Sequence, residues 1–378
     1  MGCTNDEIHT CTFVPVKPTA SGSKLAHSDR FDESKNHNVG AIVVQDNYAY
    51  LGVGKTLIIL DVTDASNPSE VGEILLPTLI DWLFLVDDYV FVTEYGLPRK
   101  TSIVNVSNPL SPVLMECEEG ISLIFARTSL IENYTFAPLQ DDGSLSVYEI
   151  IHEAEKTRLV EVSSYQSSTP PTVHLIPNLE IVGSMTRTVT DVAIVGQHAY
   201  VAESLWGGSS YYDGRVRIFD VSDPTTFEPV ADYILPNNGG AFSLLASSNY
   251  IVVADNYQEG GYAAIILDIT NPKMPQEVGV VTGLEAPIYV DDKFAYFIHV
   301  TDGLATVRVR DLANPRKIVQ SDWETSNYGW VLGWSGDMTI VDNHAYLLDS
   351  GLLHIIDVTD PFAPRELTVI NVDSGQDK

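Results

Sequence analysis

The sequence predicts an all-β protein, a seven-bladed β-propeller whose blades are four-stranded antiparallel sheets. Three observations carry this prediction. A short apolar motif recurs along the chain, as LIILDVTD from Leu57, VRIFDVSD from Val216, AIILDITN from Ala264 and LHIIDVTD from Leu353. Each clear copy is accompanied by three further strand-like segments. The copies follow one another at a period of roughly 45 residues, and units of this size bury their apolar faces by stacking around an axis.

The four strands of one unit are clearest in the copy that begins at Asp191. The segments DVAIV, HAYVAES, RVRIFDV and PVADYIL follow one another there, each rich in Val, Ile, Tyr or Phe. Turn-forming pairs such as Gly196-Gln197 and Asp223-Pro224 bound these segments, as expected for strands. Pro224 cannot donate a hydrogen bond to a neighbouring strand, so it lies outside the paired residues.

The blades can be counted at the residue that matches the first Asp of the DVTD motif. Seven residues stand there: Asp61, Asn105, Glu149, Asp220, Asp268, Asp311 and Asp357. Successive positions are 43 to 48 residues apart, except for one step of 71. That step holds a unit and an insertion, which we place within residues 163–187. An eighth, degraded blade is the alternative, but the segment is too short for four strands. We therefore predict a polar N-terminal segment over 1–38 and the propeller over 39–378.

The third copy matches the repeat least well. Its third strand reads SLSVYEI from Ser144, and IHEAEKT follows where other copies carry a T/S-D/N-x-P turn. The bounds of this blade are therefore the hardest to place. The seventh unit completes its own outer strand over residues 366–371, so closing the ring requires no exchanged strand, although CTFVPV from Cys11 could add one.

The balance of charges excludes some partners. The chain has 51 acidic and 21 basic residues, a net charge of −30, which repels phosphate backbones and argues against nucleic acid. Many of the acidic residues stand in turns, as Asp64, Asp223 and Asp360 do, where Asp caps its own backbone. No apolar run reaches the roughly 18 residues of a membrane span, so we expect no transmembrane segment.

The N-terminus indicates where the protein resides. Met1-Gly2-Cys3 precedes a polar stretch with Pro15 and Pro18, which is typical of a mature bacterial lipoprotein with a lipid anchor on Cys3. The alternative is that Cys3 is incidental, or pairs with Cys11 in a small loop. Three cysteines do not make a disulfide framework. We expect an extracytoplasmic monomer, either a cell-surface lipoprotein or a secreted protein.

The recurring motifs also resemble those of a known family. Each is preceded by a strand such as NYAYLGVG, QHAYVAES or NHAYLLDS, and together they resemble the LVIVD-repeat proteins, propellers of bacterial and archaeal cell surfaces. The resemblance covers roughly residues 40–372, with the third copy matching loosely. It implies a surface location and an adhesion or binding role, and it carries over no catalytic residues.

Long connections gather on one face of the predicted ring and are rich in aromatic residues. Tight turns occupy the other face. Flat rings beside Asn, Asp and Glu acceptors suit a neutral sugar, whose C–H faces stack while its hydroxyls donate; the alternative is that the rings pack the loops together. The candidate ligand-binding residues are Trp82, Trp206, Tyr211, Tyr212, Tyr257, Tyr262, Trp323, Tyr328, Trp330 and Trp334.

Carboxylates converge on the same opening. Glu94, Glu203, Asp255 and Asp349 stand three residues after the strand tyrosine or its equivalent. They are candidates for a Ca²⁺ site, unless they only cap the following turn. No other cofactor is expected.

Two functions follow from these residues. The first is a non-catalytic module that binds a glycan or a surface protein. The second is a polysaccharide lyase or hydrolase, with its catalytic groups among His299, Arg127, Tyr212, Asp191 and Asp337. The face with the long connections has few basic residues, Arg187 among them, that could neutralise a substrate carboxylate. We therefore favour the binding module.

Overall fold

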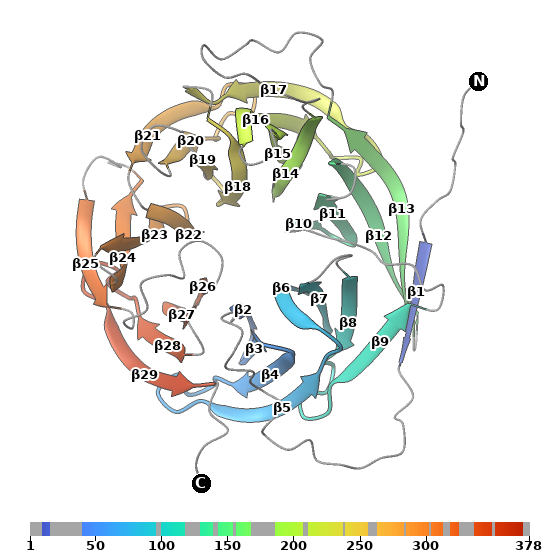
Figure 1. Cartoon of the computed structure of the whole chain (residues 1–378), viewed down its shortest axis with the longest axis vertical. Helices are drawn as coiled ribbons and strands as arrows, with labels where there is room; N and C mark the ends of the chain where they lie inside the picture. The colour runs from blue at the N-terminus through green and yellow to red at the C-terminus, as the bar shows by residue number, and fades with distance from the viewer. Residues whose placement is uncertain are drawn as a thin grey trace.

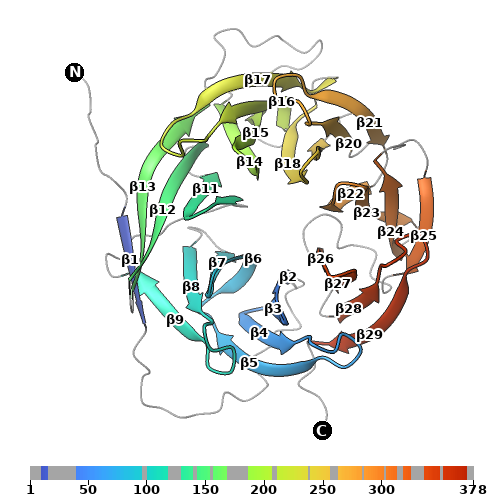
Figure 2. The same ribbon diagram turned by 180° about the vertical axis from the view of Figure 1, so that it is seen from behind.

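The chain forms a closed ring of β-sheets (Figure 1). The structure is a computed structural model that describes residues 10–15, 40–95, 100–117, 129–138, 143–153, 156–167, 186–206, 211–236, 239–255, 263–282, 285–301, 304–312, 318–324, 336–349 and 352–372. This part of the chain contains 29 strands and no α-helix, so none of its elements is a helix that could cross a membrane. Seven blades of four antiparallel strands surround one axis, as the view from behind also shows (Figure 2). The predicted fold is confirmed.

Each blade runs from an inner strand at the axis to an outer strand at the rim. Blade 1 comprises β2 (Gly40–Gln45), β3 (Tyr48–Val53), β4 (Thr56–Asp61) and β5 (Ser69–Leu75). Blade 2 comprises β6 (Leu79–Val86), β7 (Tyr89–Tyr95), β8 (Lys100–Asn105) and β9 (Val113–Cys117). Blade 3 comprises β10 (Ser129–Ile131), β11 (Tyr134–Pro138), β12 (Ser144–Glu153) and β13 (Lys156–Gln166).

The remaining four blades follow the same order. Blade 4 comprises β14 (Thr186–Val195), β15 (His198–Trp206), β16 (Tyr211–Asp220) and β17 (Glu228–Ile234). Blade 5 comprises β18 (Ala241–Ala246), β19 (Tyr250–Asp255), β20 (Ala263–Asp268) and β21 (Gln276–Thr282). Blade 6 comprises β22 (Glu285–Val290), β23 (Phe294–Thr301), β24 (Leu304–Asp311) and β25 (Ile318–Glu324). Blade 7 comprises β26 (Gly336–Val341), β27 (His344–Asp349), β28 (Leu352–Asp357) and β29 (Arg365–Asn371).

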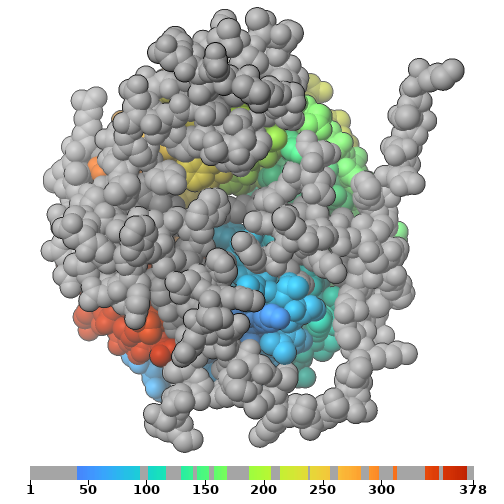
Figure 3. All heavy atoms as spheres, viewed as in Figure 1, coloured from blue at the N-terminus to red at the C-terminus, as the bar shows by residue number. Residues whose placement is uncertain are grey.

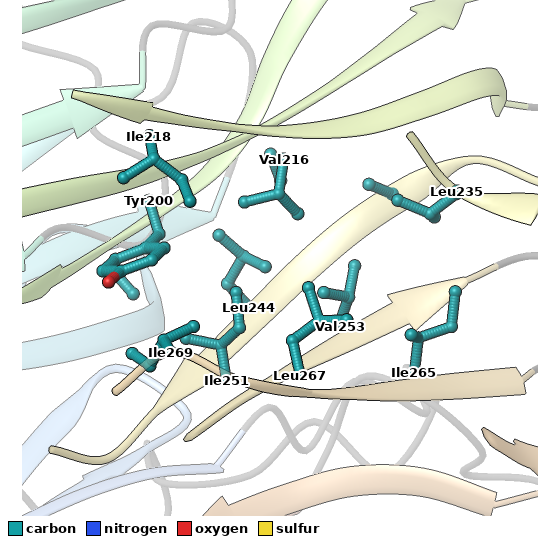
Figure 4. Close-up of a cluster of buried hydrophobic side chains, with 13 residues drawn as sticks. Tyr200, Val216, Ile218, Leu235, Leu244, Ile251, Val253, Ile265, Leu267 and Ile269 are labelled. Atoms are coloured by element: carbon teal, nitrogen blue, oxygen red, sulfur yellow. The ribbon is translucent and has the colours of Figure 1, made fainter. Parts of the chain in front are cut away.

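Apolar side chains fill the space between neighbouring blades. Between blades 4 and 5 the cluster combines residues from both sheets (Figure 4): Tyr200, Val216, Ile218, Leu244, Ile251, Val253, Ile265 and Leu267. These strands alternate little in burial because both of their faces are covered by other blades. Truncating one such side chain, as in Ile218→Ala, would cost about 2–5 kcal/mol of stability.

A pair of acceptor side chains ends the third strand of the regular blades. In blade 1 the Asp61 carboxylate accepts from the Thr63 amide at 2.9 Å, and Asp64 accepts from the Ser66 amide at 3.0 Å. Asp357 and Asp360 do the same in blade 7. The hydrogen bonds from Thr359 to Asp357 lower the pKa of that carboxyl to about 2. These turn carboxylates cap their own backbone, as the sequence predicted.

The ring closes between blades 7 and 1 without sharing a sheet. Blade 7 forms its own four-stranded sheet with β29 outermost, and so does blade 1. An apolar cluster joins the two blades, with Leu51 on one side and Leu353 on the other. The Asp337 Oδ2 atom also accepts from the Ile42 amide at 3.0 Å. An exchanged strand is not needed for closure.

Blade 3 departs from the repeat where the sequence was hardest to read. The segment IHEAEKT does not form the usual turn: β12 continues to Glu153, and β13 begins at Lys156. The segment CTFVPV forms a strand, β1 (Thr10–Pro15), but this strand does not join the ring closure between blades 7 and 1. It pairs with β9 on one side and β13 on the other, so blades 2 and 3 share a nine-stranded sheet.

Candidate functional site

The two faces of the ring differ in how the strands are joined. Tight turns connect the first and second strands of each regular blade, with Asp46, Gly196, Asp342 and Asn343 at positive φ. The second and third strands are joined at the opposite end, which we call the loop face. Successive blades are joined at this end too. In the space-filling view, described atoms of the first two blades, in blue, reach the surface at the centre of the ring (Figure 3).

Three strands of blade 4 are longer than their counterparts in blade 1, and the added residues lie on the loop face. In blade 1, β3 ends at Val53, which pairs with Thr56 across a two-residue turn. In blade 4 the matching pair is Glu203 and Arg215, and both strands continue beyond it until Trp206 pairs with Tyr211. The inner strand β14 extends alongside. The blade 4 extension is therefore a three-stranded platform, formed by residues 186–189, 204–206 and 211–213.

A buried ion pair holds the base of this extension. Arg187 is only 2% exposed and forms an ion pair with the Asp213 carboxylate. Its Nη1 atom also donates to the Asp213 carbonyl at 2.8 Å. Asp213 has a φ of 47°, a backbone conformation that Asp tolerates better than most residues. Arg187, expected only as a cation of the loop face, therefore fixes the fold of the extension.

Glu203 is the centre of a second polar network. Its side chain is fully buried, and it accepts from Arg215 Nε at 2.6 Å and from the Tyr165 hydroxyl at 2.5 Å. Arg217 donates to the same hydroxyl at 2.8 Å and to Asp232 at 3.1 Å. Burial, followed by the hydrogen bond to Glu203, raises the pKa of Tyr165. The network joins the outer strand of blade 3 to three strands of blade 4.

Asp255 is a buried carboxylate in a different environment. It is 3% exposed and packs against the backbone of Gly239, where an added Cβ would collide with the carboxylate oxygens. Burial raises its pKa to about 6, although a hydrogen bond from the Gly240 amide opposes the shift. Among the described residues its Oδ1 atom has no hydrogen-bond partner. An ionised Asp255 is therefore poorly solvated at neutral pH.

Gly239 and Gly240 belong to the connection from blade 4 to blade 5, and residues of blade 4 hold this connection as well. The Ala241 carbonyl accepts from Ser204 Oγ at 2.7 Å and from Thr190 Oγ1 at 2.8 Å. Gly214 lies so close to Gly239 and Ala241 that a Cβ would not fit without a shift of the backbone. The chain therefore passes between the blades in a single tightly packed path.

Asp191 and Asp337, proposed as catalytic groups in the enzyme alternative, link neighbouring inner strands. Asp191 Oδ2 accepts from the Leu244 amide at 2.8 Å and from Ser243 Oγ at 3.0 Å. Asp337 Oδ2 accepts from Ile42 in the same manner, and Oδ1 of each residue accepts from the next amide. The two carboxylates hold adjacent blades together. A catalytic role for them remains a prediction.

The other predicted site residues are placed only in part. Trp206, Tyr211, Tyr212, Trp323, His299, Glu94 and Asp349 lie in strands whose backbone is described but whose side chains are not. Arg127, Tyr257, Tyr262, Tyr328, Trp330, Trp334 and Cys3 lie outside the described residues. Trp82 is half-buried and packs against the cluster between blades 2 and 3. Within the described residues, no three His, Cys, Asp or Glu side chains gather as a metal site would require.

The ring of seven antiparallel blades defines this chain as a β-propeller. The LVIVD repeat model matches residues 38–75, 186–233, 238–283 and 332–372. Blades 1, 4, 5 and 7 therefore carry LVIVD repeats, as the resemblance of the motifs indicated. No curated protein sequence matches the chain.

Solved structures share the ring at low identity. A candidate 6-phosphogluconolactonase from Bacteroides uniformis has a TM-score of 0.57 at 10% identity, over 97% of each chain. A second one, from Bacteroides fragilis, has a TM-score of 0.54 at 11% identity, over 99% of this chain and 98% of that one. Sqt1 from Saccharomyces cerevisiae has a TM-score of 0.50 at 10% identity, over 88% and 86%. Such similarity establishes the shared fold alone.

Proposed function

We propose that this protein is a non-catalytic binding module, displayed on the cell surface or secreted, that recognises a glycan or a protein partner through its loop face. The observation that carries the proposal is the blade 4 extension. It lengthens three strands on one face only, and it places the backbone of Trp206, Tyr211 and Tyr212 at or near its tip. Aromatic residues on a rigid support make contact area at a low cost in conformational entropy.

The charged side chains in and below the blade 4 extension pair with one another, which supports a structural role for them. The Arg187–Asp213 and Arg215–Glu203 pairs are formed within blade 4. Asp191 bonds the next blade. Paired groups of this kind hold a recognition surface in place. A general acid or base, in contrast, must reach a substrate.

Attachment through the N-terminus is the second part of the proposal. A lipid on Cys3 would keep the protein at a membrane surface. Metabolic labelling with a radioactive fatty acid in the native host tests it: the protein takes up label, and the Cys3→Ser variant does not.

A glycan array and a panel of surface proteins test the binding role. We expect a hit whose signal falls at least about tenfold in Trp206→Ala, because stacked aromatic residues dominate such contacts. Leu110→Ala is the matched control, since Leu110 is 72% exposed in a turn on the opposite face. Equal losses in both variants, or a loss in Leu110→Ala alone, would reject the loop face as the binding surface.

A further inference from the structure

The hairpin of blade 3 carries an extension at the end opposite to the loop face. Glu149 stands where the other blades end their third strand, yet β12 continues beyond it and β13 returns, with Ile150 paired to Leu159 and His152 paired to Thr157. Both apolar residues are buried, Leu159 completely and Ile150 to all but 2%. We call residues 150–159 the blade 3 extension.

The blade 3 extension packs against blade 2. Ile150 and Leu159 share an apolar cluster with Met115 of the outer strand β9. His152 stacks on Tyr89 of blade 2, with ring centroids 4.4 Å apart and planes 7° from parallel. The extension therefore brings the outer edges of β9 and β13 close together at one place on the rim, where β12 and β13 converge on β9 (Figure 1).

The strand β1 occupies the gap between these two edges. On one side Thr10–Phe13 pair with Thr157–Val160, almost all of which belongs to the blade 3 extension. On the other side Phe13–Pro15 pair with Met115–Cys117. Each of the other five sheets in the described part of the chain has its outer strand as its last strand. An extended segment is thus bound on both edges only where the repeat pattern is broken.

We propose that the gap between β9 and β13 is a binding site for the chain's own N-terminal strand, and that this docking fixes where the N-terminal segment leaves the ring. Backbone hydrogen bonds on both sides supply the recognition, as in β-strand addition to an open sheet edge. The sequence of blade 3 departs from the repeat because it builds this site. The site is on the rim of the ring, outside the apolar core of the blades (Figure 2).

Docking of β1 would determine how far from the membrane, and in which orientation, a propeller anchored at Cys3 is held. A fully extended chain spans about 3.4 Å per residue, so Cys3 reaches at most roughly 24 Å from Thr10. Measured from Gly40, where blade 1 begins, the same cysteine would reach roughly 125 Å. A docked β1 would hold the ring close to the surface by its rim, with the loop face open to the side. This consequence rests on the proposed anchor at Cys3, whereas the docking itself does not.

Hydrogen exchange in the full chain tests the docking. Thr12→Pro removes a backbone donor in the middle of β1 and should undock the strand. We expect amides in Met115–Cys117 and Thr157–Val160 to exchange at least about tenfold faster in this variant, while the outer strand of blade 4 is unchanged. Thr4→Pro, which places the same substitution before β1, is the control and should leave both segments protected. Equal exchange in the two variants would overturn the proposal.

A distance measurement separates docking from local stability. Spin labels on Cys11, which lies in β1, and on Ser107→Cys, with Cys3 and Cys117 replaced by serine, should give a narrow distance distribution in the full chain. The distribution should broaden and shift outwards when Thr12→Pro is added. A broad distribution in both would overturn the proposal. Docking with no fatty acid on Cys3 would reject the anchor of the preceding section and leave the strand site standing.

Discussion

Blades 1 and 4 carry the same LVIVD repeat and the same four-stranded framework, yet they differ on the loop face. Blade 1 closes its central hairpin directly after Val53, whereas blade 4 has Glu203 at that position and continues the hairpin to Trp206. In the inner strand, Ala41 of blade 1 stands at the position that Asp191 occupies in blade 4. The shared residues build the ring, and the residues that differ build an additional surface on it.

The largest effect is expected at Glu203. Glu203→Ala leaves the Arg215 guanidinium and the Tyr165 hydroxyl without their buried acceptor, which should cost about 3 kcal/mol of unfolding free energy in a denaturant titration. The equivalent change in blade 1, Val53→Ala, removes only part of an apolar side chain and should cost about 1 kcal/mol. Equal costs would show that the network contributes nothing beyond packing.

The next effect concerns the carboxylates between blades. Asp337→Ala removes the acceptor of the Ile42 amide at the seam where the chain is not continuous, and we expect a loss of about 2 kcal/mol. Asp191→Ala removes the same kind of bond between two blades that are linked by the chain, so it should accelerate exchange less. Hydrogen exchange of β2 and of β18 measures this difference. A larger acceleration of exchange in β18 by Asp191→Ala than in β2 by Asp337→Ala would contradict this account of ring closure.

Asp255 gives the blade 4–5 crossing a pH dependence. Its folded pKa of about 6 lies above the ordinary value of 3.8, so the folded state binds a proton more readily than the unfolded state. Its contribution therefore stabilises the fold as the pH falls from about 7 towards 4, and that contribution is lost as the pH rises through 6. Relative to Asp255→Asn, the wild-type chain should gain on the order of 1–2 kcal/mol over this range. A constant difference from pH 8 to pH 4 would refute it.

The smallest effect is expected at the turn carboxylates, which all regular blades share. The backbone and side-chain hydrogen bonds of Thr359, followed by that of Arg365, lower the pKa of Asp357 to about 2. An NMR titration should find this carboxyl ionised at pH 3, and Thr359→Ala should raise its pKa, because the hydroxyl at 2.7 Å is then missing. An ordinary pKa in the unmodified chain would contradict this prediction.

The repeated elements could be predicted from the sequence because each depends on nearby residues. The recurring motif showed the strands, and the Asp or Asn residues at the ends of the third strands of the regular blades showed the turns. The bonds around Glu203 could not be predicted, because Arg215 meets it through the exact register of the β15–β16 hairpin and Tyr165 reaches it from the neighbouring blade. One signal was available: Asp191 and Asp337 occupy the same repeat position, which indicates a shared structural role.

Blade 3 shows the limit of repeat-based prediction. IHEAEKT stands where the other copies carry a turn, but its described residues belong to β12, which packs against blade 2 through His152, and to β13, which pairs with β1. Nothing within the blade 3 sequence indicates those partners. The aromatic residues of the loop face remain a prediction from composition, since most of their side chains lie outside the described residues.

The most direct test of the central claim is a hydrogen-exchange footprint of a bound ligand found on the array. We predict that the ligand protects the amides at the tips of β15 and β16, around Trp206 and Tyr211, and leaves the turns after Asp61 and Asp357 unchanged. Protection confined to those turns, with none at the blade 4 extension, would contradict the account.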